Sequence, residues 1–448
     1  MQGQGVASRN ALCACGSGQR VKNCCGSLDA SRKSGAAELQ DTLHRALELQ
    51  RANRLDDARA SYERALALSP ASPDALHMLG VVHLQSGDVA QALPLLLRAA
   101  ESFGWRVAAV RHNLGLAVAT AFAGPIDDAV VARWIAYDAF RRRRSAVRRA
   151  FAGRVSVVVP AYNHETYVAE ALESLRRQTR PADEIIIIDD GSTDGTGARI
   201  RDAIRGLPGH VVFRTRENRG AAITINEAIA ASTGDFVNVL NSDDRFASTR
   251  IATMIEEIAC AGLEWGFSRV ACIDAEGAAL GRERSALAAD LLYSIDDVAA
   301  RDTLGLAFLS GNPAISTGSL FFSRRLFERL GGFSDLRYNH DWDFCLRASI
   351  ESEPEFVHSV QYEYRLHGAN TILEASSQAH DEMQRMFSRF YADAVRAAKP
   401  RNPFAPLPCV WARHFFTCAL ASGHATMLAP EVLADCARRA ALLLESTA

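Results

Sequence analysis

The sequence predicts an α/β domain with a mostly parallel central sheet, preceded by an all-α repeat region and followed by further helices. Three observations lead to this prediction. Short β-branched apolar runs alternate with helical patterns over residues 154–370. A 34-residue period recurs in the N-terminal third of the chain. The 448 residues correspond to about three domains at roughly 150 residues each.

The composition is that of an ordinary globular protein. Hydrophobic residues make up 48% and charged residues 23%, which excludes a disordered, collagenous or coiled-coil chain. The net charge of −2 argues against a general nucleic-acid binder, so we expect no nucleic-acid partner. No apolar run reaches the ~18–20 residues of a membrane span, and the first residues lack a basic start and an apolar core. We therefore expect no signal peptide and a cytoplasmic location.

Four cysteines gather near the N-terminus, within residues 9–26. They are Cys13, Cys15, Cys24 and Cys25. The segment has too few apolar residues for a core, and four thiolates around Zn²⁺ would supply the missing folding free energy. It resembles the SEC-C motif, a small zinc knuckle of bacterial proteins, and this resemblance implies a docking module. The alternative is a tail with oxidisable thiols.

Small and large residues recur with a 34-residue spacing in the next segment. Ala46, Ala58, Tyr62, Ala65 and Pro70 are followed by Gly80, Ala92, Leu96, Ala99 and Gly104. Small residues at fixed sites let paired helices approach closely, and the pattern resembles the tetratricopeptide repeat. We predict a helical repeat domain over residues 38–140, with a weaker third pair at its end. The resemblance implies docking of a protein partner, and the alternative is a helical stalk.

A basic run occupies residues 141–149, between the repeats and the α/β domain. It could contact anionic lipid head groups at the inner membrane surface, at ~1 kcal/mol per basic residue. Charge runs are usually solvated, so we favour a solvated helix face at a domain junction.

The α/β domain is predicted element by element from hydrophobic period. Strands are expected at residues 155–159, 184–189, 211–213 and 236–240, and helices at residues 165–178 and 219–232. Alternating strands and helices at this spacing indicate parallel strands. Ligands of such sheets bind outside the carboxyl ends of the strands.

Acidic pairs stand at two of these strand ends. Asp189 and Asp190 follow the second strand, and Asp243 and Asp244 follow the fourth. Like charges in proximity are costly, and a divalent cation such as Mg²⁺ or Mn²⁺ would offset the cost. Such an ion completes its shell with phosphate oxygens, so the predicted substrate is a nucleoside diphosphate conjugate. The P-loop and dinucleotide fingerprints are both absent from the sequence.

Several motifs occur in a fixed order in residues 154–370. They are Val-Pro-Ala-Tyr-Asn (159–163), Asp-Asp-Gly-Ser (189–192), Asn-Arg-Gly (218–220), Asn-Ser-Asp-Asp (241–244), Leu-Gly-Gly-Phe (330–333), Asn-His-Asp-Trp-Asp (339–343) and Tyr-Arg-Leu-His-Gly-Ala-Asn (364–370). Together they resemble a family 2 glycosyltransferase of the GT-A fold.

The resemblance implies roles for named residues. Donor binding is implied for Pro160, Tyr162, Asp190, Asn218, Gly220, Asn241 and Ser242. The catalytic divalent ion is implied at Asp243 and Asp244, with His367 as a further ligand. Asp341 matches the catalytic base. Turn and helix-cap chemistry is the alternative for the Asp190 turn, and a structural role is the alternative for His367.

These roles predict an inverting, metal-dependent glycosyltransferase. The sequence lacks a Gln-x-x-Arg-Trp motif and transmembrane helices, so we expect non-processive transfer. The donor would be a UDP- or dTDP-sugar, and the acceptor a hydroxyl of a glycan, a lipid-linked molecule or a protein. Asn241 replaces a usual Asp and His340 a usual Glu, so the alternative is an interaction scaffold with a degenerate transferase domain. Residues 371–448 are expected to form a helical extension that packs on the catalytic domain, with an acceptor-site lid or a dimer contact as the alternatives.

Overall fold

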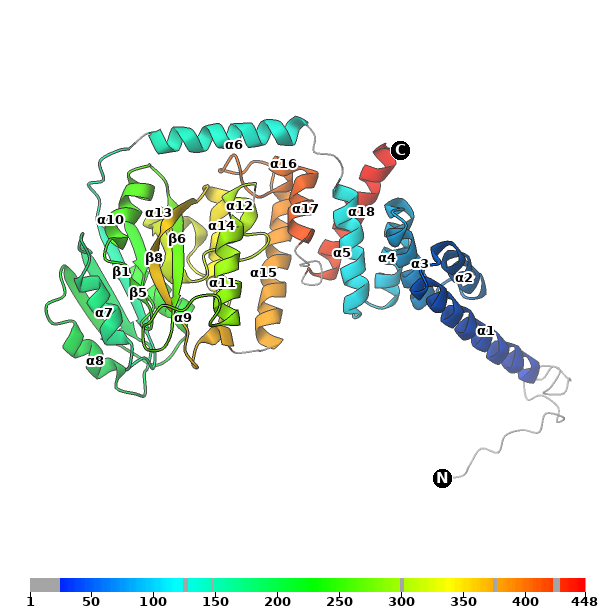
Figure 1. The fold of residues 1–448 in the computed structure, drawn as a ribbon, viewed down its shortest axis with the longest axis horizontal. Helices are drawn as coiled ribbons and strands as arrows, with labels where there is room; N and C mark the ends of the chain where they lie inside the picture. Colours follow the sequence, from blue (N-terminus) through cyan, green and yellow to red (C-terminus); the bar gives the residue numbers. More distant parts are fainter. Residues whose placement is uncertain are drawn as a thin grey trace, which may run out of the picture. The chain divides into compact units, whose positions relative to one another are not determined.

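The computed structural model describes residues 25–123, 128–146, 148–298, 302–373, 377–421 and 428–447. Two compact units make up the chain (Figure 1). The first runs to Phe122 and also includes the chain from Leu433 onward, and the second spans Ala123–Val432.

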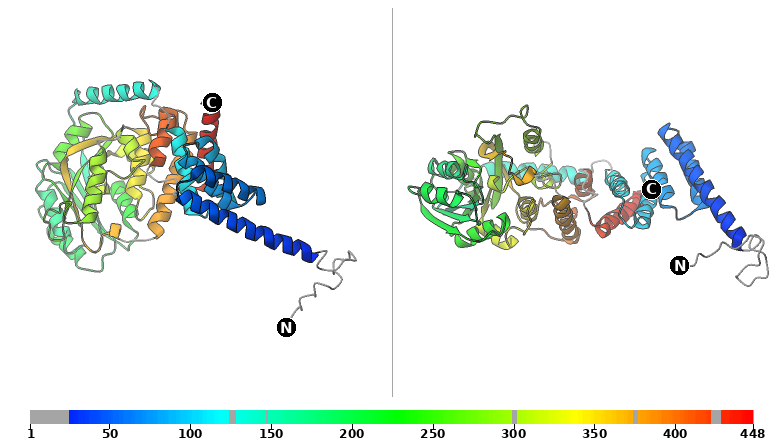
Figure 2. Two further views of the ribbon diagram at one scale, coloured as in Figure 1. Left: turned by 45° about the vertical axis from the view of Figure 1, so that its right-hand side comes forward. Right: turned by 90° about the horizontal axis from the view of Figure 1, so that it is seen from below.

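The first unit is helical. It contains α1 (Cys25–Arg51), α2 (Leu55–Leu68), α3 (Pro73–Gln85), α4 (Val89–Ser102), α5 (Ala108–Phe122) and most of α18 (Pro430–Thr447). Ser72 caps α3 by accepting from the N–H of Ala75 at 3.4 Å, and Asp88 caps α4 by accepting from that of Gln91 at 3.2 Å. Within this unit, α1 extends beyond the other helices in both views of Figure 2.

The repeat positions predicted from the 34-residue period lie between the helices. Ala58, Tyr62 and Ala92 are all buried. A Cβ on Gly80 would lie 2.7 Å from Cγ of Leu96, so α3 and α4 approach more closely than any larger residue permits. The structure therefore confirms the close helix packing that the small residues predict.

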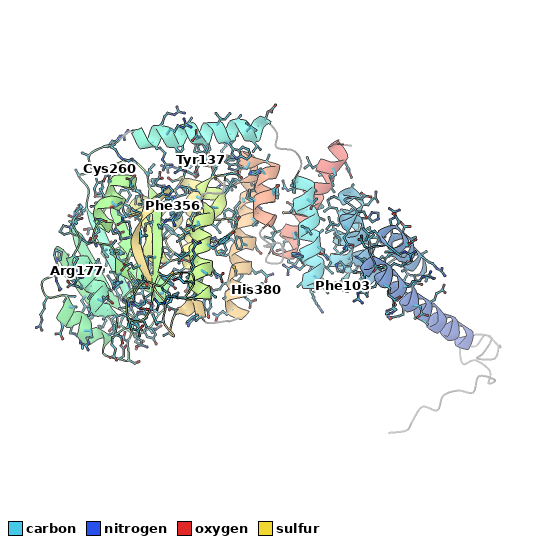
Figure 3. The ribbon with its side chains drawn as sticks, in the orientation of Figure 1. Phe103, Tyr137, Arg177, Cys260, Phe356 and His380 are labelled. Atoms are coloured by element: carbon cyan, nitrogen blue, oxygen red, sulfur yellow. The ribbon has the colours of Figure 1, made fainter. Side chains whose placement is uncertain are left out.

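A third helix pair is predicted at the end of residues 38–140, but only its first helix, α5, lies in this unit. Helix α6 (Asp128–Ala146) belongs to the second unit, where Tyr137 faces the α/β domain (Figure 3). The Tyr137 hydroxyl donates to Oε1 of Glu353 at 2.9 Å, and Arg144 donates to the Glu353 carbonyl at 3.2 Å. These contacts move the boundary of the repeat unit from residue 140 to Phe122.

The basic run begins in the last turns of α6 and packs within the second unit. Arg141 lies 3.5 Å from Glu355, and Arg148 lies 2.8 Å from Glu257. These ion pairs favour the domain-junction interpretation of the run over lipid contact. Among the residues that the structure describes, no helix has both the length and the apolar composition of a membrane span.

One eight-stranded sheet forms the centre of the second unit, in the order β3-β2-β1-β4-β7-β6-β8-β5. Its strands are β1 (Val155–Ala161), β2 (Glu184–Asp189), β3 (His210–Thr215), β4 (Phe236–Val239), β5 (Arg245–Phe246), β6 (Trp265–Ile273), β7 (Leu320–Ser323) and β8 (Glu355–Arg365). The first four strands are parallel, as predicted. β6 and β8 also pair in parallel, whereas β7 runs antiparallel to β4 and β6 and β5 runs antiparallel to β8, so the complete sheet is mixed.

Helices surround this sheet. They are α7 (Val168–Arg176), α8 (Thr196–Ala203), α9 (Ala221–Ala231), α10 (Arg250–Met254), α11 (Ala286–Asp297), α12 (Leu304–Ala307), α13 (Arg324–Leu330) and α14 (His340–Glu351), with short turns η2 (Ile255–Ala259), η4 (Thr317–Ser319) and η5 (Thr371–Leu373). Residues 185–188 of β2 are fully or almost fully buried, which explains their continuous apolar run.

The predicted C-terminal extension divides between the two units. Helices α15 (Ser377–Arg396), α16 (Pro408–Trp411) and α17 (Arg413–Ala421) belong to the second unit. The ring of Phe387 on α15 meets Trp342 of α14 edge-on, with centroids 5.0 Å apart. From Leu433 onward, α18 belongs to the first unit together with the repeat helices.

Candidate active site

The carboxyl ends of β1, β2 and β4 meet at one edge of the sheet because these strands are parallel and in register. The predicted donor-binding residues Pro160 and Tyr162 lie at the end of β1, and Asp190 directly follows β2. Tyr162 is 44% exposed, unusually open for a large side chain beside a buried strand. An aromatic face is thus accessible at the edge where ligands of such sheets bind.

Hydrogen bonds join the loops that follow β1 and β2. The N–H of Asn163 donates to Oγ of Ser192 at 2.9 Å, and Oδ1 of Asn163 accepts from the N–H of Thr193 at 2.8 Å. The N–H of His164 donates to Oγ1 of Thr196 at 2.7 Å. Asn163 adopts a positive φ of 53°, which asparagine tolerates better than most residues. These hydrogen bonds fix the orientation of the backbone at the next residue, His164.

Asp190 is almost fully buried and its carboxylate is used within the protein. It accepts from the N–H groups of Arg219 at 2.8 Å and Gly220 at 2.9 Å, and from the Arg216 guanidinium. These bonds hold the loop that presents Asn218 and Gly220, both exposed, beside β2. The geometry gives Asp190 the turn-forming role that was the alternative interpretation, while its contact with a nucleotide base stays a prediction.

Three ligand-type side chains converge after β4. His367 Nε2 lies 3.1 Å from Oδ2 of Asp243, and His164 Nε2 lies 3.7 Å from the same oxygen. Their ligand atoms all fall within 4.8 Å of one another. Ser242, itself buried, lies 2.8 Å from Nδ1 of His164 and thereby orients the ring. Burial raises the pKa of Asp243, but the charge of His164 and the hydrogen bond from His367 outweigh it and hold the pKa below its ordinary value.

The predicted metal group needs one correction, because Asp244 lies outside it. Its Oδ2 accepts from the Tyr362 hydroxyl at 2.5 Å and from Asn241 at 3.2 Å, and its Oδ1 accepts from the N–H of Arg365 at 2.7 Å. Burial, followed by the charge of Asp243, raises the pKa of Asp244 well above its ordinary value. Asp244 therefore anchors the turn to β8, and His164 takes its place in the group.

His164 was missed by the sequence analysis although a signal existed. It lies three residues beyond β1, at the edge of the sheet where the acidic pairs were expected. A rule that considers every ligand-type side chain at a strand end would have included it.

The predicted base, Asp341, lies in the first turn of α14. Its Oδ1 accepts from the N–H of Trp342 at 2.7 Å, and its Oδ2 accepts from Asn312 at 3.2 Å. Burial raises the pKa of Asp341, and the charge of His340 only partly opposes this. A carboxyl with a raised pKa is better matched to proton transfer near neutral pH. Asn312 lies in a loop that gave no sequence signal.

The carboxylates of Asp341 and of the Asp243 turn all influence the pKa of Tyr364. Burial raises the pKa of Tyr364 well above its ordinary value, and the charges of Asp244, Asp243 and Asp341 raise it further. Two hydrogen bonds also join the regions: Asn241 donates to Oγ of Ser316 at 3.0 Å, and Oγ1 of the next residue, Thr317, lies 3.1 Å from Nε2 of His340. Residues 316 and 317 thus connect the turn that carries Asp243 to the first turn of α14, which carries Asp341.

A buried arginine supports the floor of this site. Arg250 donates to Asn238 at 3.1 Å, Ser268 at 3.0 Å and the carbonyls of Gly318 at 2.7 Å and Leu320 at 3.1 Å. Burial lowers its pKa to about 9. The guanidinium thereby ties β4, β6 and η4 together.

The predicted zinc knuckle lies outside the described residues. Cys13, Cys15 and Cys24 precede the first described residue, and only the backbone of Cys25 is described, at the start of α1.

Comparison with known proteins identifies two parts of the chain. Residues 156–266 match the family "Glycosyl transferase family 2", and residues 43–105 match "Tetratricopeptide repeat". The α/β domain thus contains a segment that is similar to the family 2 glycosyltransferases. It is preceded by tetratricopeptide repeats, as the 34-residue period predicts.

Relatives of the glycosyltransferase domain occur in several bacteria. Glycosyltransferase GlyG of Streptococcus pneumoniae is 37% identical over 105 residues, which are 23% of this chain and 35% of GlyG. Succinoglycan biosynthesis protein ExoU of Rhizobium meliloti is 31% identical over 221 residues, which are 46% of this chain and 60% of ExoU. The matched region thus covers less than two thirds of either relative. This chain also aligns with the crystal structure of S. aureus TarS 1-349 in complex with UDP-GlcNAc. The alignment covers 58% of this chain and 72% of the TarS chain, at 18% identity and a TM-score of 0.43.

Proposed function

We propose that this protein is an inverting, metal-dependent, non-processive glycosyltransferase that moves one sugar from a UDP- or dTDP-sugar to an acceptor hydroxyl. The observation that carries the proposal is the position of Asp243. Its buried carboxylate lies between two imidazoles, at the carboxyl edge of parallel strands in a family 2 glycosyltransferase domain. Ligands of such sheets bind at this edge.

The residues present fit a divalent metal ion. Two imidazole nitrogens and one carboxylate oxygen, from His164, His367 and Asp243, lie close enough together to share one ion. When bound, Mn²⁺ or Mg²⁺ would neutralise the negative charge of the diphosphate. Imidazole ligands favour transition ions, so we propose Mn²⁺ over Mg²⁺.

Residues at the strand ends would hold the nucleotide. The exposed ring of Tyr162 offers a stacking face to the base. Asp190 fixes the loop that carries Asn218 and Gly220, and these two exposed residues would contact the donor. Asn241, although it replaces an Asp, keeps the turn in place through Ser316.

Asp341 would act as the general base. The acceptor oxygen attacks the anomeric carbon while the bond from that carbon to the diphosphate oxygen breaks, and the acceptor proton passes to a carboxylate oxygen of Asp341. A single displacement of this kind inverts the anomeric configuration. Asn312 and the N–H of Trp342 would keep the carboxylate oriented during the transfer.

The N-terminal modules would bring the enzyme to its partners. The repeats form helix pairs of a kind that docks proteins or peptides. We retain the proposal of a structural Zn²⁺ bound by Cys13, Cys15, Cys24 and Cys25. The acceptor would be a glycan, a lipid-linked molecule or a protein.

A donor assay on the full chain tests the proposal. UDP- and dTDP-sugars are incubated with Mn²⁺, Mg²⁺ or chelator, and released nucleotide is measured by mass spectrometry with and without candidate acceptors. We expect Mn²⁺-dependent release that stops with chelator. Absence of both donor binding and release with every donor would instead support the alternative, a scaffold with a degenerate transferase domain.

A further inference from the structure

A second group of ligand-type side chains lies on elements that the active site does not use. Asp302 lies two residues before α12, and His414 and Cys418 lie on α17. The two α17 residues are four positions apart, so they share one face of the helix. Together the three residues offer a carboxylate oxygen, an imidazole nitrogen and a thiol sulfur.

The three side chains meet at a single point. Nε2 of His414 is hydrogen-bonded to Oδ2 of Asp302, and Sγ of Cys418 lies 3.5 Å from the same nitrogen. The sulfur is 3.8 Å from that carboxylate oxygen. All three ligand atoms therefore fall within 4.8 Å of one another. Zinc holds sulfur at about 2.3 Å and nitrogen or oxygen at about 2.0–2.2 Å, so ligand atoms this close can share one ion after small shifts.

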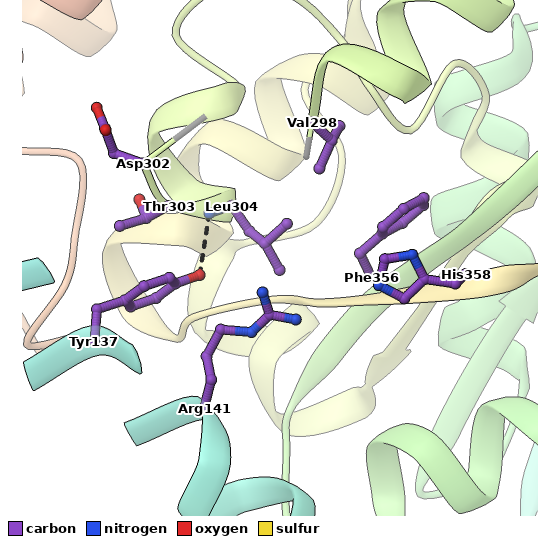
Figure 4. Close-up of a pocket in the computed structure, with 8 residues that line it drawn as sticks. All are labelled: Tyr137, Arg141, Val298, Asp302, Thr303, Leu304, Phe356 and His358. Carbon is purple, nitrogen blue, oxygen red and sulfur yellow. Dashed lines mark hydrogen bonds between the residues drawn. The ribbon is translucent and has the colours of Figure 1, made fainter. Parts of the chain in front are cut away.

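The surroundings hold the group in place. Thr303, next to Asp302, caps α12 by accepting from the N–H of Leu306 at 3.1 Å. Tyr137 accepts from the N–H of Leu304 at 3.1 Å, and the carboxylate of Asp302 points away from the neighbouring cavity (Figure 4). On the α17 side, the Trp134 ring meets His414 edge-on, with centroids 5.6 Å apart.

A nucleophilic cysteine does not explain this geometry. In a Cys-His-Asp relay the base takes the thiol proton on one ring nitrogen and is held by the carboxylate through the other. Here both Asp302 and Cys418 contact Nε2 of His414. One nitrogen cannot serve both partners of a relay, whereas convergence on one point is what a metal ion requires.

We propose that Asp302, His414 and Cys418 bind one Zn²⁺ ion, which joins α17 to the segment before α12. Thiolate and imidazole favour Zn²⁺ over the hard ions Mg²⁺ and Ca²⁺. Three protein ligands leave a fourth position for water or another ligand. The side chains of His414 and Asp302 are 17% and 31% exposed, so an ion can reach them from solvent.

Zinc has to displace a proton at this site. Without a bound ion, the hydrogen bonds that the His414 ring makes with Asp302 and Cys418 raise the pKa of His414 to about 10. Metal ligation needs the neutral imidazole, so the bound ion displaces this proton and its apparent affinity should increase as the pH rises.

Cobalt spectroscopy on the full-length chain tests the site. Cys13, Cys15, Cys24 and Cys25 are all replaced by Ser, so that the predicted knuckle cannot contribute thiolates. Co²⁺ is then titrated at pH 8, and the thiolate-to-cobalt charge-transfer band is recorded in the near ultraviolet. We expect a saturable band from about one ion per chain, displaced by Zn²⁺ and not by Mg²⁺. The active-site group contains no sulfur and is silent in this band.

Substitutions then assign the band. Cys418→Ser should abolish it, and His414→Ala should weaken Co²⁺ binding by about 100-fold or more, beyond the range for residues outside the ligand shell. Cys409→Ser is the matched control, because Cys409 is exposed on α16 and outside the group, and the band should be unchanged. A missing band in the parent protein, or a full band in Cys418→Ser, would overturn the proposal. The parent spectrum decides the first point even where a variant fails to fold.

Discussion

Two side-chain groups with the same number of ligands lie in different parts of the second unit. His164, Asp243 and His367 come from loops at strand ends, and their donors are nitrogen and oxygen. The other group, Asp302 with two α17 residues, adds a thiol. Loops at a sheet edge leave room for a phosphate-bearing substrate, whereas a helix face joined to a capped turn is better suited to a retained ion. The donor atoms and their supports, rather than the number of ligands, thus distinguish the proposed catalytic ion from the proposed structural one.

The largest expected effect comes from removing the shared carboxylate of the first group. Asp243→Asn should reduce Mn²⁺-dependent transfer by about 10³-fold or more, because metal neutralisation of the diphosphate contributes several kcal/mol. Calorimetry with UDP-sugar and Mn²⁺ should show that metal-dependent donor binding is lost. Binding with unchanged metal dependence would remove Asp243 from the site.

Its neighbour provides a matched control. Asp244 anchors the turn and has a raised pKa, so Asp244→Asn resembles the protonated carboxyl. We expect Mn²⁺ affinity to change much less than in Asp243→Asn, with the main effect on melting temperature. Equal losses of metal affinity in both variants would contradict the distinction between the two carboxylates.

The next largest effect concerns the base. Asp341→Asn should leave donor binding nearly intact and reduce turnover by about 10²–10⁴-fold. Because burial raises the pKa of Asp341, the wild-type rate should fall as pH decreases through that raised pKa, above the ordinary value of about 3.9. The variant should lack this acidic limb. Wild-type turnover in the variant would remove Asp341 from the mechanism.

A smaller effect tests the ligand that sequence analysis missed. His164→Gln should weaken Mn²⁺ binding by at least about 10-fold and lower the ratio of Mn²⁺- to Mg²⁺-supported activity, because an imidazole is replaced by an amide. His358 lines the cavity near Asp302, so His358→Gln is the control. It should change neither the Mn²⁺ affinity nor the ratio of Mn²⁺- to Mg²⁺-supported activity. An unchanged ion preference in His164→Gln would leave the first group with two ligands.

The smallest effect concerns the support of the second group. Tyr137→Phe removes a hydroxyl that bonds both Glu353 and the N–H of Leu304, and should lower the free energy of unfolding by about 1–3 kcal/mol. Urea unfolding measures this loss. Tyr293→Phe, at a site 68% exposed, should stay within about 0.5 kcal/mol of the parent. Transfer by folded Tyr137→Phe should be normal, since no active-site residue contacts the hydroxyl.

The sequence by itself determined the repeat unit and the parallel half of the sheet. The spacing that places Ala58 and Ala92 between helices is local, and so is the apolar run of residues 185–188. The same rules placed Asp243 and Asp190 at strand ends, because strand order along the chain fixes which ends coincide.

Only the tertiary structure decided which of those residues act together. Asp243 and Asp244 are adjacent in sequence, yet the carboxylate of Asp243 faces His164 and that of Asp244 faces Tyr362. Residues far apart in the chain, such as Asp302 and His414, meet through helix packing that has no sequence period. Local pattern reports the direction of a strand or the face of a helix, and contacts between distant segments depend on how whole elements pack.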